Sequence, residues 1–179
     1  LELILSRDAA LWEIVLLSLR VTLGAVAIAC LIGMPLGAAL AVLRFPGRGL
    51  LVVLCNALMG LPPVVVGLVV YMLFSASGAF GALKLLYTPT IMVIAQVVLV
   101  TPIITALTRQ VIADLHEEYR ETLTAMRATW FDVVGTLLWD ARRALVTAAL
   151  AGLGRALAEV GAVMLVGGNI DHVTRMMTT

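Results

Sequence analysis

The sequence predicts an all-α protein whose helices cross a membrane several times. Hydrophobic residues make up 62% of the 179 residues, charged residues make up 13%, and the mean hydropathy is +1.09. A soluble domain carries about 25% charged residues, so a water-soluble chain of this composition could not cover its own surface. Crossing the hydrocarbon takes about 20 apolar residues, and several stretches of the chain are that long. We therefore expect one polytopic helix bundle over residues 1–179.

The first predicted span, residues 21–43, contains no charged side chain. The amphipathic residues 8–20 before it are expected to form a helical run-in near the membrane interface. The second predicted span, residues 50–74, carries Pro62 and Pro63 in its middle, and two prolines must break or kink a helix. Because the freed backbone groups need protein or water around them, the break is expected beside a pathway and not on a lipid face.

The third predicted span, residues 88–108, begins at Thr88-Pro89, a typical N-cap followed by a first-turn proline. A polar region, residues 109–143, separates it from the fourth predicted span, residues 144–168. Loops rich in Lys and Arg face the cytoplasm. Seven of the twelve basic residues fall in two loops, so we expect both loops to be cytoplasmic and the N-terminus to be outside; they are Arg44, Arg48, Arg109, Arg120, Arg127, Arg142 and Arg143.

The polar region shows a helical pattern. Apolar residues recur there every three or four positions; they are Leu115, Tyr119, Leu123, Met126 and Trp130. Periodicity alone leaves two interpretations open. The region is either an amphipathic helix pair on the membrane surface or a docking element for a cytoplasmic partner.

The segment ETLTAMRATWFDVVGTLLWD resembles the EAA loop of ABC-importer permeases. Glu121 matches the glutamate of that motif, and Arg127 stands where its glycine is expected. Since that glycine normally permits a turn between two short helices, the turn must form here without it, or the two helices must be more continuous. The resemblance implies that Glu121, Ala125, Arg127 and Ala128 contact the ATPase subunit.

Three further segments resemble the permeases of molybdate, tungstate and sulfate importers, in the same order: RFPGRGLL, LMGLPPVVVGLVVYMLFS and GRALAEVGAVMLVGGNI. The last, followed by TRMMTT, is most similar to the tungstate type. The resemblance implies a type I ABC importer permease of a bacterial or archaeal cell membrane, working as a homodimer with an ATPase and an extracytoplasmic substrate-binding protein. Its substrate would be a tetrahedral oxyanion, tungstate before molybdate. Such permeases have at least five spans, so a fragment lacking its last helix is expected.

Other function classes have little support. A net charge of +1 does not indicate nucleic-acid binding, and the isolated His116 and His172 suggest no metal site. Cys30 and Cys55 lie in apolar runs and are interpreted as packing residues. No G-x-x-x-x-G-K-[ST] loop is present, so nucleotide must be bound by another chain, and neither catalysis nor a cofactor is expected. The alternatives are a permease for another substrate such as sulfate, a secondary transporter, or a membrane scaffold without a pathway.

Two charges, Arg155 and Glu159, lie within the fourth predicted span. A spacing of four places them on one helix face, and pairing lowers the cost of about 2.5–3.5 kcal/mol that each charge carries at mid-membrane. Small residues such as Gly161 leave room for a neighbouring helix. Two interpretations remain open: an ion pair that locks the helix, or a pair that lines the path near a gate. We expect a lock beside the gate, with Gly161, Pro62 and Pro63 as further pathway residues.

Overall fold

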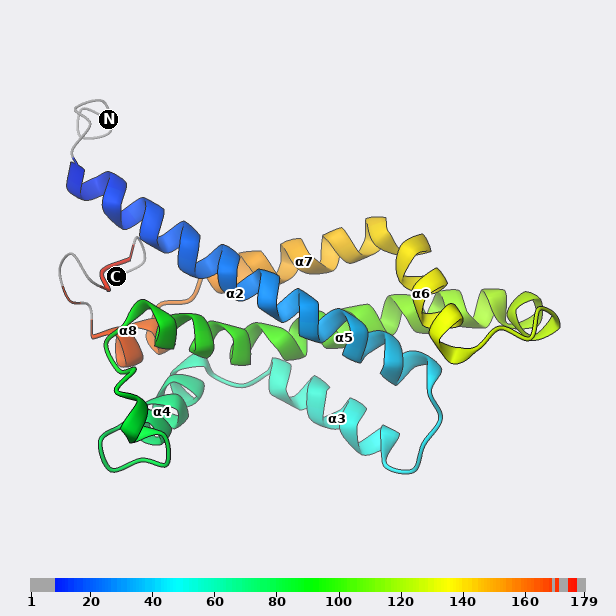
Figure 1. The fold of residues 1–179 in the computed structure, drawn as a ribbon, viewed down its shortest axis with the longest axis horizontal. Helices are drawn as coiled ribbons and strands as arrows, with labels where there is room; N and C mark the ends of the chain where they lie inside the picture. Colours follow the sequence, from blue (N-terminus) through cyan, green and yellow to red (C-terminus); the bar gives the residue numbers. More distant parts are fainter. Residues whose placement is uncertain (1–8, 169, 171–173, 177–179) are drawn as a thin grey trace.

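The computed structural model describes residues 9–168, 170 and 174–176. All regular secondary structure in this part of the chain is helical, as the sequence predicts. The elements are α2 (Ala9–Val42), α3 (Arg48–Met59), α4 (Pro63–Phe74), the 3-10 turn η1 (Gly81–Leu83), α5 (Pro89–Ala125), α6 (Trp130–Asp140), α7 (Arg142–Leu157) and α8 (Gly161–Gly167). Figure 1 shows α2, α5 and α7 extending along one long axis.

The two long helices exceed the predicted spans. The amphipathic run-in is continuous with the first span, because α2 is one helix of 34 residues. Thr88 is the N-cap of α5 and Pro89 its first residue, and α5 continues for 37 residues. At 1.5 Å per residue α5 is about 55 Å long, against about 30 Å of hydrocarbon. Nearly half of α5, at its polar C-terminal end, must therefore extend beyond the bilayer.

Two other candidate spans are broken. α3 and α4 meet at 104° around the Pro62-Pro63 pair, so the predicted break is present. Residues 144–168 do not form the single helix that we expected: α7 ends at Leu157, α8 begins at Gly161, and the two are bent by 59°. α2 and α5 are long and apolar enough to cross a membrane alone, and each bent pair is long enough only when counted as one span.

The second helices of the two broken pairs, α4 and α8, pack directly on each other. A Cβ on Gly67 of α4 would lie 2.6 Å from Cα of Ala162, and a Cβ on Gly161 would lie 2.7 Å from Cγ2 of Val64. The adjoining core combines residues of α4, α5 and α8, among them Val70, Met92 and Val166. Glycine at these positions is what allows the two backbones to approach so closely.

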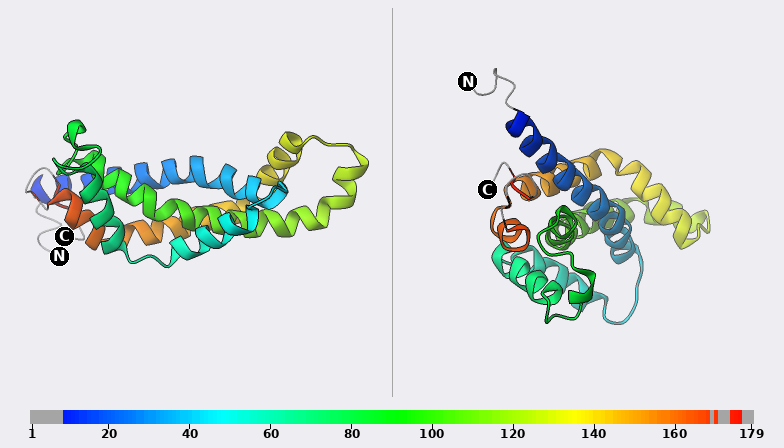
Figure 2. Two further views of the ribbon diagram at one scale, coloured as in Figure 1. Left: turned by 90° about the horizontal axis from the view of Figure 1, so that it is seen from below. Right: turned by 60° about the vertical axis from the view of Figure 1, so that its left-hand side comes forward.

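A second core lies at the opposite end of the bundle. Ala38 and Ala41 near the end of α2 are buried there with Ile112 of α5 and Leu137 of α6. Arg48 closes α2 at this end, because its Nε donates to the carbonyl of Leu40 at 2.6 Å and its Nη2 to that of Ala41 at 3.1 Å. The loop after α2 and the turn between α5 and α6 share this end of the molecule, while the loop between α4 and α5 lies at the other (Figures 1 and 2).

A turn separates α5 from α6 even though glycine is absent. Arg127 adopts the left-handed conformation, with φ of 51°. Its N–H donates to the carbonyl of Thr124 at 3.1 Å, and the N–H of Ala128 donates to that of Leu123 at 3.2 Å. This bond pair is the Schellman arrangement that usually ends helices at a glycine. Of the two possibilities that the sequence left open, the turn is the one observed.

We predict that the α4–α8 contact tolerates no added methyl group. Gly67→Ala should lower the stability of the detergent-solubilised protein by about 1–3 kcal/mol, because its Cβ would overlap the backbone of α8. Gly24→Ala is the matched control, since no heavy atom lies within 4 Å of a Cβ at that α2 position. Thermal unfolding would measure both, and equal midpoints for the two variants would contradict the close contact.

We also predict that Arg127→Gly leaves the α5–α6 turn intact and stabilises it by up to about 1 kcal/mol. A side chain in the left-handed region costs about 1–2 kcal/mol, and the added freedom of glycine in the unfolded chain offsets part of that gain. Arg127→Val should instead destabilise, because a branched Cβ fits this conformation poorly. The rate of protease cleavage at the turn measures how stable the turn is in each variant. Faster cleavage of the glycine variant than of the valine variant would refute the prediction.

Candidate functional site

The break between α7 and α8 is organised by one carboxylate. Nη1 of Arg155, in the last turn of α7, lies 3.5 Å from Oε2 of Glu159. The other oxygen, Oε1, accepts a hydrogen bond from the backbone N–H of Ala162 at 2.8 Å. The side chain of Glu159 is 2% exposed and that of Arg155 is 32% exposed. Glu159 therefore pairs with the arginine and also caps the first turn of α8.

The predicted ion pair is present, but not on a continuous helix. Glu159 lies between α7 and α8. Its carboxylate pairs with Arg155 at the end of α7 and accepts a hydrogen bond from Ala162 at the start of α8. The cap explains why a carboxylate stands here, because an unpaired N–H at this depth would cost several kcal/mol. It also gives the two charges different surroundings, since only the arginine reaches open space.

The structure brings the proline break close to this charge pair. Val64, directly after Pro63 in α4, packs against Gly161, the residue that follows the break in α8. Pro62 is exposed and Pro63 is half-buried. The predicted pathway residues of the two broken pairs thus lie in one region of the molecule, where α4 meets α8.

Gln96 is part of this region, and the sequence analysis missed it. Its side chain, on α5, is 1% exposed. Nε2 donates to the carbonyl of Ala156 at 3.4 Å, and the N–H of Glu159 donates to the same carbonyl at 3.3 Å. Gln96 therefore ties α5 to the broken end of α7. The available signal in the sequence was an amide side chain within a predicted span. It was overlooked because only charged residues within the spans were considered.

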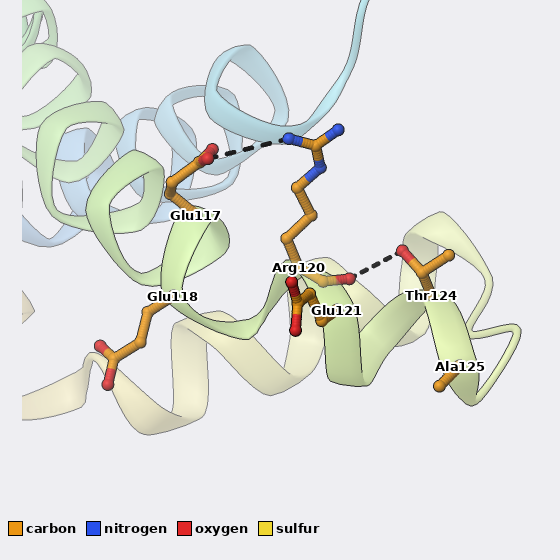
Figure 3. A pocket seen from close by; sticks show the side chains of 6 residues that line it. All are labelled: Glu117, Glu118, Arg120, Glu121, Thr124 and Ala125. Atoms are coloured by element: carbon orange, nitrogen blue, oxygen red, sulfur yellow. Dashed lines mark hydrogen bonds and ion pairs between the residues drawn. The ribbon is translucent and has the colours of Figure 1, made fainter.

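The predicted coupling residues lie at the other end, on the tip of α5. Six residues of its last turns line an open hollow of about 810 Å³, shown in Figure 3: Glu117, Glu118, Arg120, Glu121, Thr124 and Ala125. Nη1 of Arg120 lies 3.8 Å from Oε1 of Glu117. Glu118 and Glu121 are two further exposed carboxylates of the hollow. The hollow is therefore acidic and open to solvent.

Beyond the tip, Arg127 is exposed and Ala128 is half-buried against the core beneath α6. α6 begins at a capping box in which the hydroxyl of Thr129 and the carboxylate of Asp132 bind each other's backbone N–H groups. The Thr129 hydroxyl also donates to the Asp132 carboxylate. This bond and the one from the Thr129 N–H hold the pKa of Asp132 below its ordinary value, because both stabilise the charged form. Among the described residues, no three His, Cys, Asp or Glu side chains gather closely enough to hold a metal ion.

We predict that the cap and the ion pair of Glu159 can be separated by substitution. Glu159→Ala removes both and should destabilise the protein by about 2–3 kcal/mol, because it leaves an N–H and part of a guanidinium uncompensated. Glu159→Gln keeps an oxygen for Ala162 and should cost distinctly less. Thermal unfolding in detergent measures the difference, and an equal loss in both variants would show that the charge alone matters.

Comparison with known proteins agrees with this architecture. A family model described as a binding-protein-dependent transport system inner membrane component matches residues 33–179. A probable anion ABC transporter permease protein of Haloferax volcanii is 36% identical over 172 residues, which cover 93% of this chain and 74% of that protein. The tungstate uptake system permease protein of Peptoclostridium acidaminophilum is 36% identical over 179 residues, which cover 100% of this chain and 78% of that protein.

A sulfate transport system permease protein of Escherichia coli is more distant, at 32% identity over 140 residues, which cover 74% of this chain and 50% of that protein. The similarity to tungstate-type permeases that the sequence motifs indicate is thus confirmed. With its helical bundle, its candidate spans and a family match over most of its length, the chain belongs to the binding-protein-dependent transport system inner membrane components, the permease subunits of ABC importers.

Proposed function

We propose that the chain is the translocation subunit of an importer that carries a tetrahedral oxyanion into the cytoplasm, with tungstate as the first candidate and molybdate as the second. The similarity to a tungstate permease over the whole chain carries this proposal. Sulfate is the alternative substrate, supported by the weaker similarity to sulfate permeases. ATP would be hydrolysed by a separate ATPase subunit, and a substrate-binding protein would deliver the anion to the outer face of a permease homodimer.

The tip of α5 is the proposed contact with the ATPase. Glu121, Ala125 and Arg127 are exposed there, and Ala128 anchors the turn from below. α5 is one helix from Gln96 to Ala125, a distance of about 44 Å at 1.5 Å per residue. A displacement of the tip would therefore reach the α7–α8 break along a single helix, whose hydrogen-bond ladder is interrupted at Pro102. In this topology the end that carries the tip and the basic loops is cytoplasmic, which the positive-inside rule supports.

The α7–α8 break is the proposed gate region. Arg155 is one-third exposed, so its guanidinium could meet a passing oxyanion while Glu159 holds its position. Exchanging the two charges would not test this role cleanly, because an arginine at position 159 could not accept the N–H of Ala162. Arg155→Gln is the better probe, since it removes the positive charge and leaves the cap of α8 in place.

We predict that Glu121→Lys weakens binding of the ATPase. Reversing a charge at the acidic tip should lower co-purification of the ATPase at least several-fold without preventing membrane insertion. Asp114→Lys is the matched control, because it makes the same change on the same exposed helix face two turns closer to the bundle. An equal effect of both variants, or no effect of either, would remove the docking assignment.

Uptake into proteoliposomes tests the substrate and the energy source together. The permease is reconstituted with an ATPase and a substrate-binding protein of a tungstate importer, and internal tungsten, molybdenum and sulfur are measured. ATP-dependent tungstate uptake that outcompetes equimolar molybdate and sulfate is the expected result. Preference for sulfate would select the alternative, and uptake driven by an ion gradient without ATP would refute the importer mechanism.

A further inference from the structure

α6 has an apolar face that no other part of the described chain covers. Val133 and Leu137 on its inner side are buried against α2 and α5. On its outer side Phe131 is 68% exposed and Trp139 is 72% exposed. These two aromatic residues are eight positions apart, so they stand on one side of the helix, two turns from each other. Two large exposed aromatic side chains on one side of a short helix indicate a contact surface.

The position of α6 points to the bilayer surface as its environment. The residues beneath it, Ala38 and Ala41, belong to the last turns of α2, a candidate span. Arg142, two residues after the end of α6, starts α7. With the end of α2 and the start of α7 taken as the membrane boundary, α6 lies at the level of the bilayer surface. Figures 1 and 2 show α6 running across the long axis of the bundle, well short of the tip of α5.

Two arginines lie beside Trp139 on the outer face. The guanidinium of Arg142 lies 5.1 Å from the ring centre of Trp139, and its Nη1 donates to the Trp139 carbonyl at 2.9 Å. Arg143 is exposed next to it. Two carboxylates of α6 lie nearby, and both are engaged within the protein: Asp132 accepts the hydroxyl and N–H of Thr129, and Asp140 accepts the hydroxyl of Tyr119 on α5.

We propose that the α6 outer face, formed by Phe131, Trp139, Arg142 and Arg143, seats on the adjoining leaflet and binds the headgroups of anionic phospholipids. Tryptophan rings favour the headgroup level of a bilayer, and an arginine fork matches a phosphate. The α5 tip, with its exposed Glu118 and Glu121, offers such a leaflet no comparable cationic and aromatic surface. The two surfaces therefore take different partners, and the lipid contact does not depend on which substrate is carried.

Tryptophan fluorescence tests the contact directly. The full permease with Trp12→Phe and Trp130→Phe retains Trp139 as its one native reporter. In vesicles containing phospholipids brominated near the headgroup end of the acyl chains, Trp139 should lose about half of its emission or more. The control replaces all three native tryptophans by Phe and adds Met126→Trp at the exposed tip, which should lose almost none. Equal quenching of the two reporters would overturn the proposal.

Headgroup selectivity tests the role of the arginines. Brominated phosphatidylglycerol should quench Trp139 at lower mole fraction than brominated phosphatidylcholine, and salt should reduce the difference. Arg142→Gln with Arg143→Gln should abolish the preference. Arg120→Gln with Arg127→Gln removes the same charge from the tip region and should retain it. Quenching without preference would overturn the anionic-lipid site, and loss of lipid quenching when the ATPase is added would reassign the face to protein docking.

Discussion

A helix that breaks inside a membrane must satisfy the backbone groups that it frees, and here Glu159 does so between α7 and α8. Its two oxygens act on different groups: one pairs with Arg155 and the other accepts the N–H of Ala162. This bond sets where α8 begins. Because Gly161 and Ala162 pack on α4, the place of the second broken pair follows from the first. The ion pair is thus a support for helix packing, whatever further role it has.

α5 joins the two ends of the molecule. Near its start Met92 packs against Gly167 of α8, and Gln96 donates a hydrogen bond to the last turn of α7 at the break. Further along, Ile112 lies in the core under α6, and the hydroxyl of Tyr119 binds Asp140. Pro102 removes one hydrogen bond between these two sets of contacts, so a bend of α5 would concentrate there.

Features with a local cause could be predicted from the sequence, and features with a tertiary cause could not. The break at Pro62-Pro63 and the start of α5 at Pro89 were predictable, because proline acts on its own backbone. The α7–α8 break contains no proline and depends on a bond between Glu159 and Ala162 together with the fit against α4. The helical periodicity of the sequence continues without interruption across this break. Gln96 was missed for a related reason, since a neutral amide reveals its importance only through the carbonyl that it reaches.

Charge is distributed unevenly along the length of α5, and this bears on how the tip can act. With about 55 Å of helix and about 30 Å of hydrocarbon, some 25 Å of α5 lies outside the bilayer. The Debye length at physiological salt is about 8 Å, so the exposed Glu121 near the helix end is screened from headgroup charges. In the proposed topology a partner at the tip therefore meets the acidic hollow without interference from the membrane. Its effect on the distant break must be transmitted mechanically, by displacement of the helix, because its charge is not felt there.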